Sequence, residues 1–319
     1  MKKLIVLTCC VVICLISFGQ KRNEIIVAKD GSGNFTTVQG AFDKIPSDNK
    51  LPVTIFIRKG IYKEKLHLTK SKKLVTLIGE DAANTILTFD DHTGRVAPSG
   101  ETIGTSTSFS FLINADDFTA RNISFQNDAG YDAGQAVAVH INGDRVAFYN
   151  CRFLGNQDVL LTNNKDSRAY FKNCYIEGTT DFIFGAATAY FDHCSIYCKR
   201  DSHITAASTP QDHAFGYVFY DCKITGASNV TKADLGRPWR DYACVAFIHC
   251  YLGHVIKQEG WSNWHNTNRD KTARYFEYQS YGPGADPSGR VAWSHQLTAE
   301  QAKAYTIKNV FNNWTPTDK

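Results

Sequence analysis

The sequence predicts an all-β protein, a right-handed parallel β-helix (a single-stranded solenoid) with short capping helices. Three observations lead to this prediction: a six-residue pattern recurs along the chain, its apolar residues lie two positions apart, and helical periodicity is scarce. The pattern reads Phe-x-x-Cys-x-apolar, and successive copies are 20 to 28 residues apart. A fixed pattern at this spacing indicates stacked repeats, each covering the apolar face of the next.

The start of the chain has the features of a cleaved secretory signal peptide. Two lysines follow Met1, residues 4–18 are an almost unbroken apolar run, and Gly19 supplies a small residue for cleavage. The run is short for a transmembrane helix. We therefore expect residues 1–19 to be removed on export. A lipoprotein is the less favoured alternative, because no cysteine of the run (Cys9, Cys10 and Cys14) follows the small residue.

Helical signals near both ends of the remaining chain match the caps that a solenoid needs. Phe35–Ile45 carries apolar residues near helical spacing, and Gln296–Lys303 contains good helix formers. No linker rich in proline or serine interrupts the sequence between them. We expect one domain over residues 23–319.

The repeat itself predicts two strands that meet at a bend. Apolar residues alternate on both sides of the cysteine, and the alternation breaks where Asn, Asp or His precedes it. Stacked coils would therefore carry a ladder of polar residues at the bend. A β-propeller would need regular antiparallel hairpins, whose turn signals the sequence lacks. The copies are centred on Ile123 (a variant without cysteine), Cys151, Cys174, Cys194, Cys222 and Cys250.

The column of cysteines is expected to be structural. A buried thiol behaves as a small apolar side chain, and one per coil forms an inward stack. Metal binding is the alternative, but these spacings do not make a compact ligand cluster. Cys174 and Cys194 are one coil apart, near enough for a disulfide in an oxidising compartment. Without the three leader cysteines, seven of the ten remain, so at least one thiol is unpaired.

Composition excludes some functions. The chain is 43% hydrophobic and 21% charged, as in a globular protein with an ample core. Its formal net charge is +4, and two of those charges, on Lys2 and Lys3, belong to the leader. The remainder is too small to indicate nucleic-acid binding.

Two aspartates occupy the same place in successive copies of the repeat. Asp158 lies seven residues after Cys151, and Asp181 lies seven after Cys174. If the repeats stack, the two residues lie on adjacent strands, roughly 4.8 Å apart at the backbone. Such a pair suits acid/base or nucleophilic catalysis, because two close carboxyls rarely both ionise. Asp201 shares the offset, but the neighbouring Lys199-Arg200 indicates a solvated surface acid.

The segments around these aspartates resemble those of the pectin methylesterases (pectinesterases, carbohydrate esterase family 8). The resemblance extends over nearly the whole chain after the leader, with the blocks in family order. Its motifs are Asp30–Phe35, Gly60–Glu64, Gly134–Val139, Gly155–Leu160, Asp181–Gly185, Leu235–Trp239, Glu259–Trp264 and Tyr281–Ala285.

The resemblance implies a role for five residues. Asp181 would be the nucleophile that forms an acyl-enzyme, and Arg237 would hold its carboxylate with a two-pronged contact. Asp158 would protonate the leaving methanol and then activate water. Gln157 and Gln135 would donate to the oxyanion. Taken alone, the two glutamines would be turn residues, and the surrounding motifs reverse that interpretation.

Three more residues would contact the sugar. The resemblance places Trp239 and Phe184 in the substrate cleft, although either could be an ordinary core aromatic. Thr105 matches a family threonine near the substrate, and an exposed loop threonine is the competing interpretation. No Gly-x-Ser-x-Gly motif supports a serine triad.

The resemblance therefore implies a secreted hydrolase that removes methyl esters from the galacturonate units of pectin. Alternatives on the same fold are a pectate lyase, a polygalacturonase or an esterase for non-pectic acyl groups. A glycan-binding module is the non-enzymatic alternative, but it would have no reason to keep the acids, Arg237 and both glutamines together.

We expect methyl-esterified pectin as the partner and no cofactor or metal. We also expect no nucleic acid, no membrane association after cleavage and a monomer. The periplasm or the extracellular space would be its location.

Overall fold

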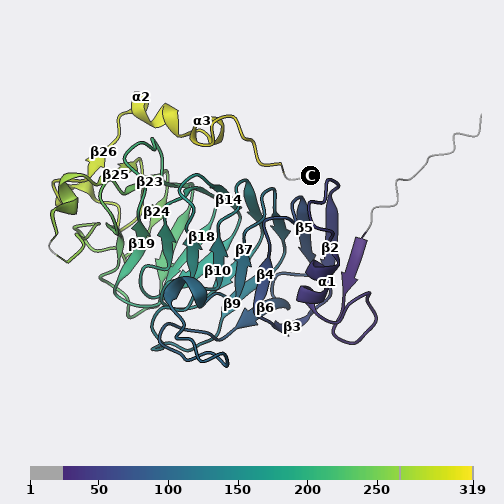
Figure 1. The fold of residues 1–319 in the computed structure, drawn as a ribbon. Helices are drawn as coiled ribbons and strands as arrows, with labels where there is room; N and C mark the ends of the chain where they lie inside the picture. Colours follow the sequence, from purple (N-terminus) through teal and green to yellow (C-terminus); the bar gives the residue numbers. More distant parts are fainter. Residues whose placement is uncertain (1–23, 266, 318–319) are drawn as a thin grey trace, which may run out of the picture.

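The computed structural model describes residues 24–265 and 267–317. Strands within these ranges form three parallel sheets of eleven, eight and seven strands, which we call sheets A, B and C. From β2 to β25, successive strands of the chain join different sheets, so the coils stack along one axis (Figure 1). The right-handed parallel β-helix predicted from the repeat is confirmed. The predicted signal peptide lies outside the described residues.

The strands are as follows. Sheet A contains β1 (Glu24–Val27), β2 (Val53–Ile57), β5 (Val75–Gly79), β8 (Thr119–Arg121), β11 (Val146–Tyr149), β14 (Arg168–Lys172), β17 (Thr188–Asp192), β20 (Tyr217–Tyr220), β23 (Cys244–Ile248), β25 (Arg274–Tyr278) and β26 (His295–Gln296). Sheet B contains β3 (Gly60–Lys63), β6 (Thr85–Phe89), β9 (Ser124–Asn127), β12 (Arg152–Leu154), β15 (Tyr175–Gly178), β18 (Ser195–Cys198), β21 (Lys223–Gly226) and β24 (Tyr251–Leu252). Sheet C contains β4 (Leu66–Leu68), β7 (Phe111–Ile113), β10 (Val139–Ile141), β13 (Leu160–Thr162), β16 (Ile183–Gly185), β19 (His203–Ala207) and β22 (Asp234–Pro238).

Each copy of the repeat is the corner where a strand of sheet A meets a strand of sheet B. The phenylalanine lies on the sheet A strand and points into the core, where it stacks on its equivalents in the next coils. From Phe148 to Phe247 five rings stack, the four successive centroid distances are 5.1, 4.7, 4.4 and 4.4 Å, and neighbouring ring planes deviate by 8° at most. The alternation seen in the sequence is thus the inward and outward alternation of a strand.

The polar residue before each cysteine makes the bend. These residues have φ between 50° and 54°, the left-handed region that asparagine tolerates better than most residues. The predicted polar ladder is therefore confirmed, and the left-handed backbone at the bend explains why asparagine, aspartate and histidine occupy it. Its members are Asn122, Asn150, Asn173, His193, Asp221 and His249.

The cysteines form an inward ladder, but the disulfide considered between Cys174 and Cys194 is not formed. Both are buried free thiols. Side chains at matching positions of parallel coils point the same way, whereas a disulfide needs two Cβ atoms that converge. The sulfurs contact strand carbonyls instead: Cys174 Sγ lies 3.6 Å from the oxygen of Phe148, and Cys194 Sγ lies 3.4 Å from that of Phe171.

Helices cover the first coil and one outer face. The predicted N-terminal cap is α1 (Val38–Lys44), which begins where the Thr37 side chain accepts the amide of Gly40. The predicted C-terminal helix is shorter than expected and occupies α2 (Ala299–Ala302). The remaining helical segments are η1 (Thr105–Thr107), η2 (Asn268–Lys271), η3 (Pro287–Gly289), η4 (Lys303–Tyr305) and α3 (Ile307–Val310).

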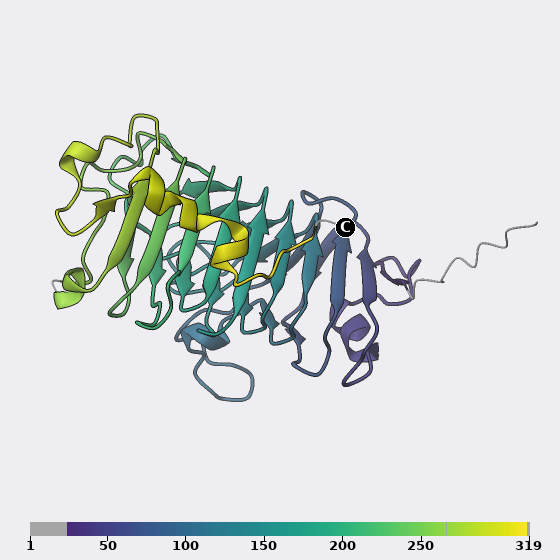
Figure 2. The same ribbon diagram turned by 90° about the horizontal axis from the view of Figure 1, so that it is seen from above.

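The C-terminal segment covers the side of the solenoid rather than its end. Figure 2 shows it running across the strands of sheet A, back toward the N-terminal coils. Phe311 packs against Tyr170 and Tyr190 on the outer face of that sheet. No helix in the described part of the chain has both the length and the apolarity to cross a bilayer.

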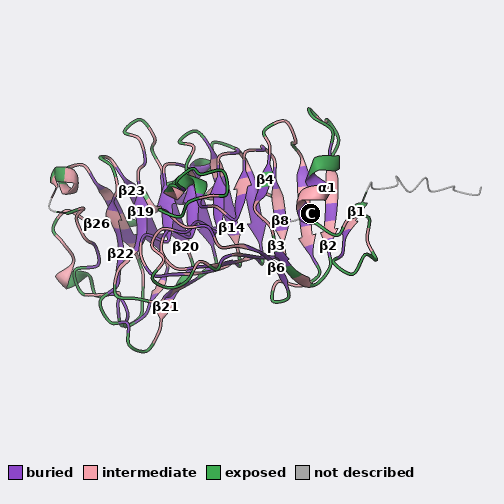
Figure 3. Ribbon diagram, turned by 60° about the horizontal axis from the view of Figure 1, so that its bottom comes forward, coloured by how far each residue is buried: buried purple, intermediate pink, exposed green. Residues whose placement is uncertain are grey.

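The buried residues lie along the strands inside the coils, and the exposed ones lie mainly in the loops (Figure 3). Sheet C also carries buried apolar residues on its outer face. They form a separate cluster of Val137, Leu161, Phe184 and Ala206, with Trp239 and Trp264 packed against it. This second apolar layer is the floor of the candidate site.

Candidate active site

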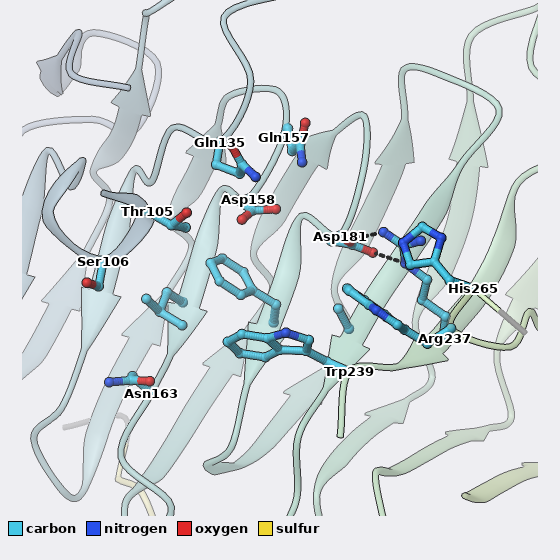
Figure 4. A pocket seen from close by; sticks show the side chains of 14 residues that line it. Thr105, Ser106, Gln135, Gln157, Asp158, Asn163, Asp181, Arg237, Trp239 and His265 are labelled. Carbon is cyan, nitrogen blue, oxygen red and sulfur yellow. Dashed lines mark hydrogen bonds and ion pairs between the residues drawn. The ribbon is translucent and has the colours of Figure 1, made fainter. Parts of the chain in front are cut away.

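A cleft of about 560 Å³ lies over the outer face of sheet C (Figure 4). All eight residues selected from the sequence for catalysis or sugar contact line it, although they span more than a hundred positions of the chain. They are Thr105, Gln135, Gln157, Asp158, Asp181, Phe184, Arg237 and Trp239. The stacking of coils brings them together, because equivalent positions of successive coils become neighbours.

Asp158 and Asp181 are neighbours at the point where the chain enters sheet C. Each precedes its strand by two residues, and the strands pair Leu160 with Ile183. Both aspartates have positive φ values, 64° and 48°, so they make the turn into the strand themselves. They are only 7% and 6% exposed. The predicted adjacency is confirmed, and the acids are also largely removed from solvent.

Arg237 holds one acid and not the other. Its Nε lies 3.0 Å from Asp181 Oδ1 and its Nη2 lies 2.6 Å from Oδ2, the bidentate geometry that suits a planar guanidinium. The indole of Trp264 lies against the guanidinium, 4.0 Å from its central carbon to the ring centre. Arg237 is thus held on two sides, and the charge of Asp181 is neutralised where it is buried.

Burial raises the pKa of the Asp158 carboxyl well above its usual range. The charge of Asp181 raises it further, and the Arg237 guanidinium acts in the opposite direction. A proton on Asp158 is therefore favoured beside an ion-paired Asp181. The two carboxyls have different environments, and this difference is what an acid and a nucleophile in one site require.

The two glutamines lie side by side on adjacent coils, where Gln135 and Gln157 pair as a parallel bridge. Gln157 directly precedes Asp158, and its carbonyl accepts the amide of Ala136 at 3.1 Å. Figure 4 shows both side-chain amides on the same side of the cleft as Asp158, with Arg237 on the other. The cleft thus has amide groups at one side of the acid pair and a cation at the other.

Aromatic side chains form the floor and wall of the cleft. The rings of Phe184 and Trp239 lie 5.9 Å apart at an angle of 60°. Trp239 is partly exposed, with Arg240 over its ring. Thr105 stands on the opposite wall in η1, where its hydroxyl lies 3.1 Å from that of Thr93.

Asp201 does not belong to the site. Sheet C pairs Ile183 with Thr205, so His203 takes the position next to Asp181. Two extra residues in that coil leave Asp201 in an exposed turn, where it accepts the amides of Thr231 and Lys232. The surface acid inferred from Lys199-Arg200 is confirmed.

Some lining residues were not selected from the sequence. Trp264 ends one of the quoted motifs, yet only the structure reveals its contact with Arg237. His265 follows it at the rim, beside Arg237 in Figure 4. The other lining residues were not selected as site residues either: Ser106, Leu161, Asn163 and Ala206.

Comparison with known proteins identifies the family. A model of the pectinesterase family matches residues 24–313. The chain belongs to the pectinesterase family. As a member of it, the protein is a carboxylic ester hydrolase.

Individual pectinesterases match over most of their length. Pectinesterase 31 of Arabidopsis thaliana is 40% identical over 281 residues, which cover 86% of this chain and 88% of the relative. A solved pectin methylesterase from carrot superposes with a TM-score of 0.83 at 33% sequence identity. The match covers 91% of this chain and 93% of the carrot enzyme's chain. A pectin methylesterase solved in complex with a hexasaccharide has a TM-score of 0.80 at 27% identity, covering 92% and 98%.

Proposed function

We propose that the protein hydrolyses the methyl esters of galacturonate units in pectin, giving methanol and de-esterified pectin. The observation that carries the proposal is the asymmetry of the acid pair. Asp181 is held by a bidentate ion pair, while burial favours a proton on Asp158 in the same cleft. Membership of the pectinesterase family supports the same reaction.

In the first step, an oxygen of Asp181 attacks the ester carbonyl and forms an acyl-enzyme. The C–O bond to the methoxy group breaks, and the leaving oxygen takes the proton of Asp158 to become methanol. Gln135 and Gln157 donate amide hydrogens to the negative charge that develops on the carbonyl oxygen. Arg237 orients Asp181 and prevents it from turning away from the ester.

In the second step, Asp158 is a carboxylate and accepts a proton from water. The resulting hydroxide attacks the acyl carbon, the bond to Asp181 breaks, and the product leaves as a free galacturonic acid unit, which then loses its proton to solvent. Asp158 regains its proton and Asp181 its charge, so the site returns to its starting state. No metal or redox group is needed to balance either step.

The substrate would lie along sheet C. Trp239 and Phe184 offer apolar ring surfaces for a pyranose, and Thr105 faces them across the cleft. A similar pectin methylesterase was solved in complex with a hexasaccharide, which supports an oligosaccharide as the ligand. Trp264 adds an indole that the sequence had not suggested.

The alternatives explain the cleft less well. A lyase or a polygalacturonase has no use for two amides beside a single ion-paired acid, and a glycan-binding module has no use for an acid with a raised pKa. An esterase for other acyl groups would share the catalytic residues, so the substrate alone distinguishes it.

We propose further that the protein is exported, acts as a monomer and needs no cofactor. Export rests on the leader of residues 1–19. Sequencing of the mature N-terminus from culture medium and periplasm tests it, with a start just after Gly19 expected. Light scattering tests the monomer.

The main test is methanol release from highly methylated pectin by the purified protein. We expect methanol and titratable acid in equal amounts, with unchanged chain length and no absorbance from unsaturated uronates. Ester substrates without galacturonate, such as acetylated xylan, provide the comparison. Unsaturated products, shortened chains or a preference for the other esters would contradict the proposal.

A further inference from the structure

We propose that His203 and Asp234 are positioning residues that fix Asp181 in its reactive orientation. The inference rests on the proposed function of Asp181 as the nucleophile. Neither residue is among those of the described chain that line the cleft, so both would act through Asp181 and Arg237.

The acid pair is part of a longer ladder of titratable residues. Asp158 and Asp181 occupy the first two positions, His203 is next, and Asp234 pairs with His203 in the register of sheet C. The amide of Asp181 donates to the carbonyl of His203 at 2.7 Å. The main chain of His203 thus holds the backbone of Asp181 at a φ of 48°, in the left-handed region that few residues other than glycine, asparagine and aspartate adopt.

The side chain of His203 is fixed in turn by Asp234. The imidazole Nδ1 lies 2.9 Å from both carboxylate oxygens of Asp234, which is 1% exposed. Asp234 also contacts Lys257 Nζ at 3.0 Å and the Ser262 hydroxyl at 2.7 Å. A buried carboxylate with three polar partners holds a single orientation, so it gives the imidazole a rigid acceptor.

These contacts close a ring around the nucleophile. Asp234 begins β22, and Arg237, three residues later on the same strand, grips the side chain of Asp181. His203 begins β19 and holds the backbone of Asp181. The bond between His203 and Asp234 joins the two strands at the end where Asp181 sits, so its backbone and carboxylate are fixed relative to each other.

Further along, the same strands approach too closely to shift. A Cβ on Gly236 would lie 1.9 Å from Thr205 Oγ1, and that hydroxyl donates to the carbonyl of Leu235 at 2.8 Å. Before β16 and β19, the Thr180 hydroxyl donates to Ser202 Oγ at 2.9 Å, so the segment of Asp181 is also tied to that of His203. The side-chain bond from His203 to Asp234 lies at the start of β19 and β22, in the register that places His203 beside Asp181.

Loss of this bond should lower kcat and leave KM nearly unchanged, since substrate contacts remain while the attacking oxygen loses its alignment. We expect His203→Leu to reduce kcat about tenfold to a hundredfold, as small misplacements in catalytic sites do. His203→Asn places an amide N–H near the position of Nδ1 and should recover most of the rate. Asp201→Asn, at the exposed acid outside the site, should behave as wild type.

The experiment measures methanol release at several pectin concentrations, with circular dichroism to give the folded fraction of each variant. A loss of kcat per folded molecule in His203→Leu, reversed in His203→Asn, supports the positioning role. Equal kcat per folded molecule in His203→Leu and wild type overturns it, as does a rise in KM that accounts for the whole loss.

If His203→Leu does not fold, the comparison moves to Asp234→Ala against Asp234→Asn, which keeps an acceptor oxygen for the imidazole. The same loss and recovery are expected, and equal kcat values for the two variants overturn the proposal. A wild-type protein without methanol release would contradict the proposed function instead, so the two failures are distinguishable.

Discussion

Two columns of polar residues run along this solenoid, and both have left-handed backbone conformations. The column between sheets A and B, with Asn150, Asn173 and Asp221, is largely exposed and only turns the chain. The column that enters sheet C, with Asp158 and Asp181, is buried beside a guanidinium. In both columns, stacking of the coils places polar residues next to one another. Only in the column that enters sheet C do burial and the Arg237 guanidinium make these neighbours a candidate catalytic site.

The largest expected effect comes from removing the nucleophile. Asp181→Asn keeps the shape and the contact with His203 O but loses the charged oxygen, so we expect a fall in kcat of roughly 10⁴-fold or more. Initial rates of methanol release measure it, and an unchanged circular dichroism spectrum shows that the fold survives. A folded Asp181→Asn enzyme with full activity would remove Asp181 from its role.

Arg237→Lys tests the cation that distinguishes the two columns. An ammonium cannot reproduce two parallel hydrogen bonds or the stacking on Trp264, so Asp181 keeps a positive neighbour but loses its orientation. We expect kcat to fall about 10²-fold in the methanol assay. Arg240→Lys, which changes an exposed arginine over Trp239, is the matched control. Similar rates in the two variants would contradict an orienting role.

Burial of Asp158 should cost stability at neutral pH. Its folded-state pKa is raised above the unfolded value of about 3.9, so the native state binds more protons between those two pKa values. Stability therefore falls as the pH rises through this window. Asp158→Asn removes the titration and should raise Tm at pH 7, by about 2 °C for each kcal/mol.

Below about pH 3.9 both states hold the proton, and the difference between Asp158→Asn and wild type should largely disappear. Thermal melts at both pH values test this, and a Tm gain that is the same at each pH would refute it. Asp158→Asn should also hydrolyse pectin slowly, because it lacks the proton donor. Asp158 would then support catalysis while lowering the stability of the fold.

The sequence predicted what repetition controls. Phe-x-x-Cys-x-apolar gave the coils, the polar bend and the adjacency of Asp158 and Asp181, because a parallel stack converts equal offsets into contacts. The equal offset did not place Asp201 beside Asp181, because two extra residues in that coil shift its register. The disulfide considered between Cys174 and Cys194 is not formed, because residues on adjacent coils can be neighbours without their Cβ atoms converging.

The repeat could not predict contacts between segments that lie far apart in the sequence and outside the coils. Trp264 meets Arg237 from a loop outside the sheets, and the C-terminal segment lies on the outer tyrosines of sheet A rather than over the last coil. Both depend on how a nonrepetitive segment folds back, which no period in the sequence encodes.

The smallest expected effect concerns the exposed column and tests whether it is structural only. Asn173 has a φ of 52° and is exposed, so Asn173→Ala should lose about 1 kcal/mol of unfolding free energy, because alanine adopts the left-handed region less readily. Asn173→Gly should lose less, since glycine has no Cβ penalty there. Urea titrations measure both variants, and each should keep wild-type kcat. A reduced kcat in folded Asn173→Ala would show that the two columns are coupled, because the bend at Asn173 leads through β15 to Asp181.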